Sequence, residues 1–159
     1  METRALTKDD FDRIVRVIDA WWGGPSAALA HPMFHYELGQ LSRVVVDEGE
    51  LVGFLFGFVA TAHLAPVPES PPVGARLGYV HLVGIHPDYR RRGVGKLLYA
   101  AFEQDCRAAG CTALKAITTM GDEGSVGFHL ALGWSVREVA DYAGPGRARL
   151  LFHKQLGSS

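Results

Sequence analysis

The sequence predicts an α/β domain built on one central β-sheet, and two observations support this. Apolar residues recur at helical spacing in two long stretches, which follow residues 7 and 93. Most other apolar segments are short, rich in β-branched residues and bounded by glycine, proline or acidic turns. The two kinds of segment follow one another in the order βααβββαβαββ, and such a mixture of strands and helices is typical of a single sheet covered by helices.

The N-terminal half is expected to begin with a short strand and a capped helix. Thr7 is a good N-cap, and Asp10 three residues later resembles the acidic partner of a capping box. The helix is expected to stop at Gly23-Gly24-Pro25, and His31-Pro32 is a candidate break in the helical stretch that follows. The expected bounds are strands at 3–6, 41–46, 51–59 and 77–85, helices at 7–22 and 26–38, and a proline-rich loop at 61–74.

The C-terminal half is expected to alternate helices with shorter strands. An amphipathic helix should begin after the turn at 90–95 and stop at Gly110, since Val94, Leu97, Leu98 and Phe102 share one face. The remaining expected elements are a strand at 112–117, a short helix at 126–132 that ends at Gly133, and two strands at 134–139 and 147–153.

Composition indicates an ordinary globular protein. The 159 residues suit one domain, expected to span 1–159 with a core at about 3–155. The formal net charge of −1 gives no general attraction to nucleic acid or to an anionic membrane, and no apolar run is long enough to cross a bilayer. We therefore expect a cytoplasmic protein with no nucleic-acid or membrane partner. Cys106 and Cys111 are expected to be reduced, and no Cys/His spacing predicts a metal site.

The strongest chemical signal is a basic, glycine-containing turn between a buried strand and an amphipathic helix, at residues 83–98. The free N–H groups of a helix's first turn point outward, and the helix dipole makes that end positive. Gly93 and Gly95 remove side chains that would keep an anion away, and Arg91, Arg92 and Lys96 add positive charge. This combination predicts a phosphate-binding loop.

Two common phosphate-binding motifs do not fit this loop. A dinucleotide fingerprint that starts at Gly93 would need a small residue where Leu98 stands. A P-loop would need serine or threonine where Leu97 stands, and a glycine in place of Arg90. A nucleotide-dependent oxidoreductase or NTPase is therefore disfavoured.

The pattern that does fit is R-x-x-G-x-G at residues 90–95, preceded by a strand and His86-Pro87. It resembles motif A of the GNAT superfamily of N-acetyltransferases. Residues 122–134 resemble motif B of the same superfamily, in which N-x-x-S-x-x-F-(Y/H)-x-x-L-G-(F/W) is common, although Asp122 stands where asparagine is usual. The resemblance covers the element order of nearly the whole chain and implies a single mixed central β-sheet flanked by helices on both faces.

The resemblance implies that acetyl-CoA is the cosubstrate, with no metal. The phosphate loop would grip the pyrophosphate of acetyl-CoA, and the backbone of the preceding strand would pair with the pantetheine arm. One backbone N–H there would polarise the thioester carbonyl. The implied CoA-binding residues are Val83, Gly84, Ile85, Arg91, Arg92, Gly93, Val94, Gly95 and Lys96.

Three residues are candidates for proton transfer. Many relatives place a carboxylate base on the strand at the position of Tyr79, which departs from that pattern. His81, two residues further along the strand, titrates near neutral pH and is the candidate base, with Glu37 as a weaker one. His129 stands where many relatives carry the tyrosine that protonates the CoA thiolate. We expect Val126, Leu130 and Leu132 to pack inward while His129 faces the sulfur.

The resemblance implies direct transfer of acetyl to a primary amine in a ternary complex. The acceptor, a small molecule or a peptide, is left open, with Trp21, Trp22 and Tyr36 as candidate lining residues of its pocket. Relatives often dimerise, so a homodimer is one expectation. Because the strand carboxylate is missing, a non-catalytic acyl-CoA-binding module is the alternative function.

Overall fold

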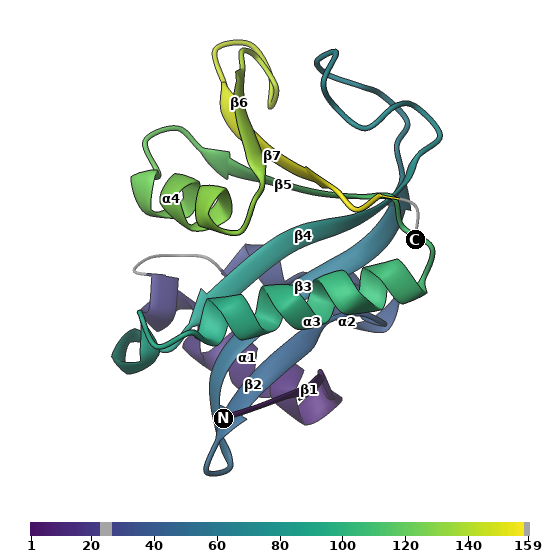
Figure 1. Cartoon of the computed structure of the whole chain (residues 1–159). Coiled ribbons are helices and arrows are strands. Elements are labelled where there is room, and N and C mark those ends of the chain that lie inside the picture. Colours follow the sequence, from purple (N-terminus) through teal and green to yellow (C-terminus); the bar gives the residue numbers. More distant parts are fainter. Residues whose placement is uncertain (23–26, 158–159) are drawn as a thin grey trace. The chain divides into compact units, whose positions relative to one another are not determined.

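The computed structural model describes residues 1–22 and 27–157, and its elements follow the expected order (Figure 1). The predicted helix stop at 23–25 and the predicted start at 26 lie outside the described residues. The strands are β1 (Glu2–Ala5), β2 (Arg43–Asp47), β3 (Glu50–Thr61), β4 (Arg76–Ile85), β5 (Ala113–Thr119), β6 (Ser135–Val139) and β7 (Arg149–Gln155). The α-helices are α1 (Lys8–Trp22), α2 (Met33–Tyr36), α3 (Val94–Ala108) and α4 (Glu123–Ala131), and the 3₁₀ helices are η1 (Ala27–Ala30) and η2 (Pro87–Tyr89).

The seven strands are hydrogen-bonded in the order β1-β2-β3-β4-β5-β7-β6, in a mixed sheet as predicted. The pairs β1–β2, β2–β3, β5–β7 and β6–β7 are antiparallel. The chain divides into two compact units, which we describe separately. The first unit comprises Met1–Phe58 and Val80–Cys106, and the second comprises Val59–Tyr79 and Arg107–Ser159.

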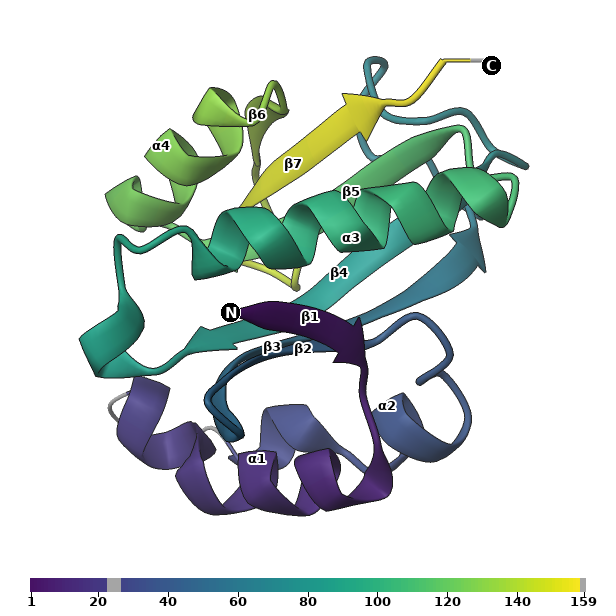
Figure 2. The same ribbon diagram turned by 60° about the horizontal axis from the view of Figure 1, so that its bottom comes forward.

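In the first unit, helices cover both faces of the strands (Figure 2). The face that α1 covers holds one cluster of buried apolar side chains, and successive residues of β3 point to opposite faces. Gly53 and Gly57 lie on the α3 side, where an added Cβ would come within 2.4 Å of Val94 Cγ1 and of Phe102 Cε1 respectively. These two glycines therefore allow α3 to pack closely on β3. The α1-side core contains Phe11, Ile14, Ile18, Trp21, Phe54 and Phe56.

The predicted cap of α1 is confirmed, with aspartate in the place of the usual glutamate. The Thr7 amide donates to Asp10 Oδ2 at 2.8 Å, and the Asp10 amide donates to Thr7 Oγ1 at 3.3 Å. The break at His31-Pro32 is also confirmed, since η1 ends at Ala30 and α2 begins at Met33. Proline has no N–H to continue the first helix and a φ suited to starting the second.

In the second unit, α4 lies beside β6 (Figure 2) and begins three residues earlier than the sequence predicted. The cause is Asp122, whose carboxylate accepts a hydrogen bond from the Ser125 amide at 3.0 Å and so caps the helix. A small core of Ala62, Leu77 and Ala113 packs between the strands of this unit, with Tyr79 against it.

Two predictions from composition can be compared with this structure. Cys106 and Cys111 are both buried and carry free thiols, as expected. Within residues 1–22 and 27–157, no helix combines the length and the apolar character that a membrane span requires.

Asp10 gives a test of how the first helix is anchored. Burial raises the pKa of Asp10, but hydrogen bonds from Arg4 and Thr7 outweigh burial and hold it below its usual value. The carboxylate therefore stabilises the fold above the ordinary aspartate pKa, and this contribution is lost as the pH falls through the lower, folded value. We expect Asp10→Asn to lower the free energy of unfolding at pH 7 by about 2 kcal/mol and to make its decline below about pH 4 shallower. Urea unfolding across that range measures both effects.

Asp12→Asn is the matched control for this prediction. Asp12 lies on the same helix but pairs with Lys8 at the exposed surface, where ion pairs contribute little. Equal losses of stability in the two variants would show that the Arg4–Asp10 pair does not anchor the helix.

Candidate active site

The loop between β4 and α3 has the backbone conformation of an anion-binding turn. Arg91 and Gly93 both have positive φ, 61° and 83°, and α3 begins directly afterwards at Val94. A Cβ added to Gly93 would meet nothing within 4 Å, so the space beside this residue is open. The left-handed backbone conformation itself favours glycine here.

The first turn of α3 presents its amides at the end of this loop. The first i to i−4 bond is that of Leu97 N to Gly93 O at 3.0 Å, so the amides of Val94, Gly95 and Lys96 precede it and have no partner within the helix. Arg91 and Lys96 are exposed, and neither makes an ion pair with any residue that the structure describes. Outward amides at a positive helix end, together with unpaired cations, can hold a phosphate group.

Three contacts within the first unit hold this loop in place. The Arg90 guanidinium donates to the carbonyl of Trp21 at 2.8 Å, in the last turn of α1. The Tyr89 hydroxyl donates to Asp47 at 2.9 Å, and Arg92 lies 4.3 Å from the centre of the Tyr89 ring. The loop is thus anchored by its own side chains, and anchoring of this kind reduces the ordering that a ligand must impose.

From Tyr79 to Ile85, strand β4 shows alternating exposure. Tyr79, His81, Val83 and Ile85 are half-buried, and the residues between them are buried. Gly84 is a position of close packing, because a Cβ there would lie 2.3 Å from Phe54 Cε1. Gly84 thus packs closely against the side chain of Phe54, a core residue of β3.

The environment of His81 favours its neutral form. Its ring stacks on Phe34 with a centroid distance of 3.8 Å, and its Nε2 lies 2.8 Å from the carbonyl oxygen of Leu29. A carbonyl can only accept, so Nε2 carries the proton and Nδ1 holds the lone pair. Burial lowers the pKa of His81, and the Leu29 hydrogen bond opposes that effect only partly. The residue therefore has a proton-accepting nitrogen at neutral pH.

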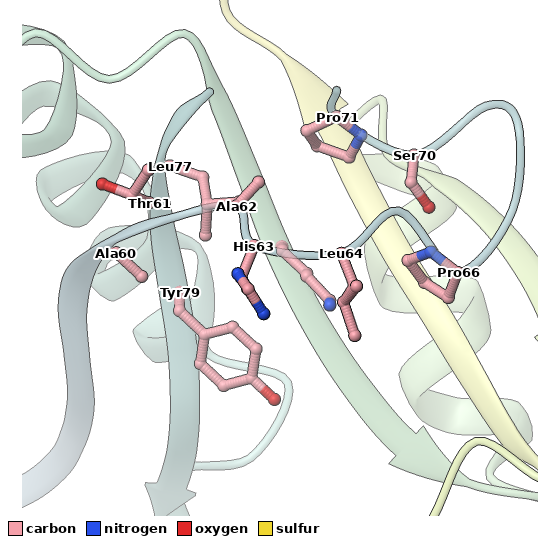
Figure 3. A pocket seen from close by; sticks show the side chains of 11 residues that line it. Ala60, Thr61, Ala62, His63, Leu64, Pro66, Ser70, Pro71, Leu77 and Tyr79 are labelled. Atoms are coloured by element: carbon pink, nitrogen blue, oxygen red, sulfur yellow. The ribbon is translucent and has the colours of Figure 1, made fainter. Parts of the chain in front are cut away.

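In the second unit, Tyr79 lines a pocket of about 250 Å³, shown in Figure 3 with His63 and Leu64. We call this the Tyr79 pocket; the end of β3, the loop after it, β4 and β5 supply its walls. Burial, and to a lesser degree the nearby Tyr142, raises the pKa of Tyr79 to about 12. At neutral pH its phenol stays protonated, so it can donate a hydrogen bond but cannot act as the base.

The expected orientation of the α4 side chains is wrong. His129 is buried, with 5% of its surface exposed, and stacks on Phe152 of β7 at a centroid distance of 4.0 Å, whereas Leu130 is 52% exposed. His129 rather than Leu130 lies on the inward face, where its ring also contacts Trp134 at a centroid distance of 5.0 Å. Its Nδ1 lies 2.8 Å from the carbonyl oxygen of Ser125, and burial lowers its pKa.

Other candidates from the sequence take different places. Trp21 is a core residue that packs on Phe54, while Trp22 and Tyr36 are exposed on the surface of the first unit. Glu37 is exposed at the end of α2. No group of His, Cys, Asp or Glu in the described parts of the chain is arranged to hold a metal ion.

Sequence reasoning missed two features of the site. Asp122 uses both carboxylate oxygens inside the protein, one on the Ser125 amide and one on the Thr118 hydroxyl at 3.1 Å. The presence of aspartate at this helix start was a signal for the cap. The Tyr79 pocket was missed because much of its wall comes from the proline-rich loop, which has no periodic pattern.

Known proteins share both the sequence pattern and this fold. Residues 11–134 match the model of the acetyltransferase (GNAT) family. An acetyltransferase of Yersinia pestis (strain Pestoides F) is 22% identical over 144 residues, which cover 87% of this chain and 91% of the relative.

Two solved structures illustrate the similarity of fold. The NatC complex bound to Gag peptide and CoA matches with a TM-score of 0.78 at 14% identity, covering 98% of each chain. An aminoglycoside 6′-N-acetyltransferase complexed with coenzyme A matches with a TM-score of 0.74 at 16% identity, covering 100% of this chain and 99% of the other. At such identities these structures support the fold.

The chain belongs to the GNAT family of acetyltransferases. The predicted α/β fold and the predicted enzyme class are therefore confirmed.

Proposed function

We propose that this protein transfers the acetyl group of acetyl-CoA directly to a primary amine, with both substrates bound in one ternary complex. The observation that carries this proposal is the loop from β4 into α3, where Arg91 and Gly93 at positive φ lead into three outward amides. Solved structures of the same fold contain CoA, which supports the choice of cosubstrate.

The loop would bind the pyrophosphate of acetyl-CoA through the amides of 91–96 and the charges of Arg91, Arg92 and Lys96. The backbone of segment 83–85, in which Val83 and Ile85 are half-buried, would pair with the amides of the pantetheine arm as an added strand does. When bound, acetyl-CoA supplies the activated thioester. The protein contributes a backbone N–H of this segment, which stabilises charge on the carbonyl oxygen during attack.

His81 is the proposed base. An amine with a pKa near 10 is mostly an ammonium ion at neutral pH, and only its neutral form attacks the thioester. Because Nε2 of His81 is committed to Leu29, the proton would be taken by Nδ1. The lowered pKa keeps Nδ1 unprotonated at neutral pH, and the Phe34 stack fixes the ring plane.

His129 is the proposed acid that protonates the CoA thiolate, and its hydrogen bond and burial restrict which protonation state can donate. The Ser125 carbonyl holds a proton on Nδ1, so donation from Nε2 requires the doubly protonated ring. Burial lowers the pKa of His129 and makes that form less populated at neutral pH. A thiolate is a fair leaving group, so the expected benefit is modest and grows as the pH falls.

The acceptor is proposed to be a small molecule or a peptide with a primary amine. One structure of this fold holds a peptide, and another is an aminoglycoside acetyltransferase, so the fold supports either kind of acceptor.

The phosphate loop is tested by Gly93→Asp. The substitution places a carboxylate in the open space beside Gly93 and should weaken CoA binding at least roughly tenfold by repulsion. Gly93→Asn is the matched control, because asparagine has the same shape, tolerates positive φ and carries no charge. Calorimetric titration with CoA measures both variants. If the two folded variants bound CoA with equal affinity, the proposal that this loop binds the pyrophosphate would be contradicted.

The base is tested by His81→Gln and His81→Ala, with thiol release followed from pH 6 to pH 10. Both variants should lose activity at neutral pH, by roughly tenfold to a hundredfold, and recover part of it near the pKa of the amine. Glutamine can still donate to the Leu29 carbonyl but takes up no proton. If His81→Gln were as active as the wild type while His81→Ala was not, the histidine would be structural.

The acid is tested by His129→Phe, which keeps an aromatic ring against Phe152 and removes the proton. We expect kcat to fall by no more than about a hundredfold while CoA affinity is unchanged. Steady-state kinetics, with single-turnover measurements to confirm that chemistry limits the rate, provide the comparison. A kcat equal to that of the wild type would rule out the acid role.

A further inference from the structure

The Tyr79 pocket has an apolar wall and a small volume. Its lining includes Leu64, Pro66 and Leu77, and its volume of about 250 Å³ is just below the usual range for drug-sized ligands. Figure 3 shows the side chains that line the pocket, among them Tyr79, His63 and Leu64. A compact organic molecule with an apolar body is the kind of ligand that fits this space.

The charge of the pocket is positive. None of its lining residues is aspartate or glutamate, and Lys115 is the lysine among them. The Lys115 ammonium lies 5.3 Å from the centre of the Tyr142 ring and pairs with no carboxylate among the described residues. A cation beside an apolar wall attracts an anionic group and disfavours a second cation.

Ser70 supplies an independent observation. It lines the pocket, only 8% of its surface is exposed, and its hydroxyl has no hydrogen-bond partner in the described structure. A buried hydroxyl without a partner is costly, and a polar ligand atom would remove that cost.

Tyr79 of this pocket belongs to the same strand, β4, as the proposed base. Tyr79 lies two residues before His81 and four before Val83 on the same strand. Its phenol is kept protonated and can donate a hydrogen bond. The lining therefore offers an ammonium and an unpaired hydroxyl to one bound molecule.

We propose that the Tyr79 pocket binds the acceptor and selects amines that also carry a carboxylate on a compact apolar body, as neutral amino acids do. Lys115 binds the carboxylate, Ser70 donates to a ligand oxygen, and the apolar wall contacts the side chain. This inference rests on the acetyl transfer proposed above. It disfavours polycationic acceptors, because the pocket has no carboxylate to pair with their additional charges.

The test compares acceptors that differ only in the carboxylate. Thiol release from acetyl-CoA is measured with leucine, methionine and phenylalanine, each against its amide, and with 1,4-diaminobutane. We expect kcat/KM for at least one amino acid to exceed that for its amide about tenfold to a hundredfold. This ratio corresponds to the contribution of one hydrogen bond to a charged group, here the acceptor carboxylate. Higher activity with the amides or the diamine would overturn the proposal.

Three variants sharpen this comparison. Lys115→Glu should abolish the preference for the carboxylate and raise activity with the diamine. Arg147→Glu makes the same change of charge in the second unit at an exposed residue that does not line the pocket, and it should keep the preference. Ser70→Ala should raise the KM for the amino acid several-fold without loss of stability, because its hydroxyl has no partner to lose. Unchanged acceptor kinetics in Lys115→Glu would overturn the proposal.

Binding without turnover separates this inference from the proposed function. The N-acetyl amino acids and their N-acetyl amides are titrated calorimetrically into the CoA-saturated protein. Binding of the acids that depends on Lys115, without acetyl transfer to any amine, would support the pocket and contradict the transfer. Acetyl transfer that does not depend on the carboxylate of the acceptor would support the proposed transfer and contradict the proposed role of the pocket. No binding of the acids would overturn the pocket assignment.

Discussion

The close packing of α3 on β3 is the constraint on which the proposed cofactor site depends. Gly53 and Gly57 give the helix room to approach, and a side chain at either position would collide with Val94 or Phe102. Val94 is also the first residue of α3, so the same contact holds the start of the helix against the sheet. The packing of Val94 over Gly53 therefore positions the first turn of α3, and with it the amides that point outward from that turn.

The two proposed proton-transfer histidines share one physical feature. His81 and His129 each place a ring nitrogen against a backbone carbonyl and stack on a phenylalanine. In each case the carbonyl determines which nitrogen carries the proton, and burial lowers the pKa. The consequences differ, because a lowered pKa favours a base and disfavours an acid.

Much of the fold could be predicted because its signals are local. The Thr7 cap, the break at Pro32 and the turn at Gly93 each depend on a few neighbouring residues. The inward position of His129 could not be predicted in the same way, because it depends on packing against Phe152, which is distant in the sequence. The Tyr79 pocket was equally inaccessible, since it is formed by loop and strand residues with no common periodicity.

The bond from Arg90 to the carbonyl of Trp21 has a consequence for engineering. The acceptor of this bond is a backbone atom, which every amino acid provides at that position. Surface residues of α1, such as the exposed Trp22, can therefore be exchanged without removing the anchor of the loop between β4 and α3. The exposed surface of α1 can therefore be redesigned while the loop between β4 and α3 keeps this anchor.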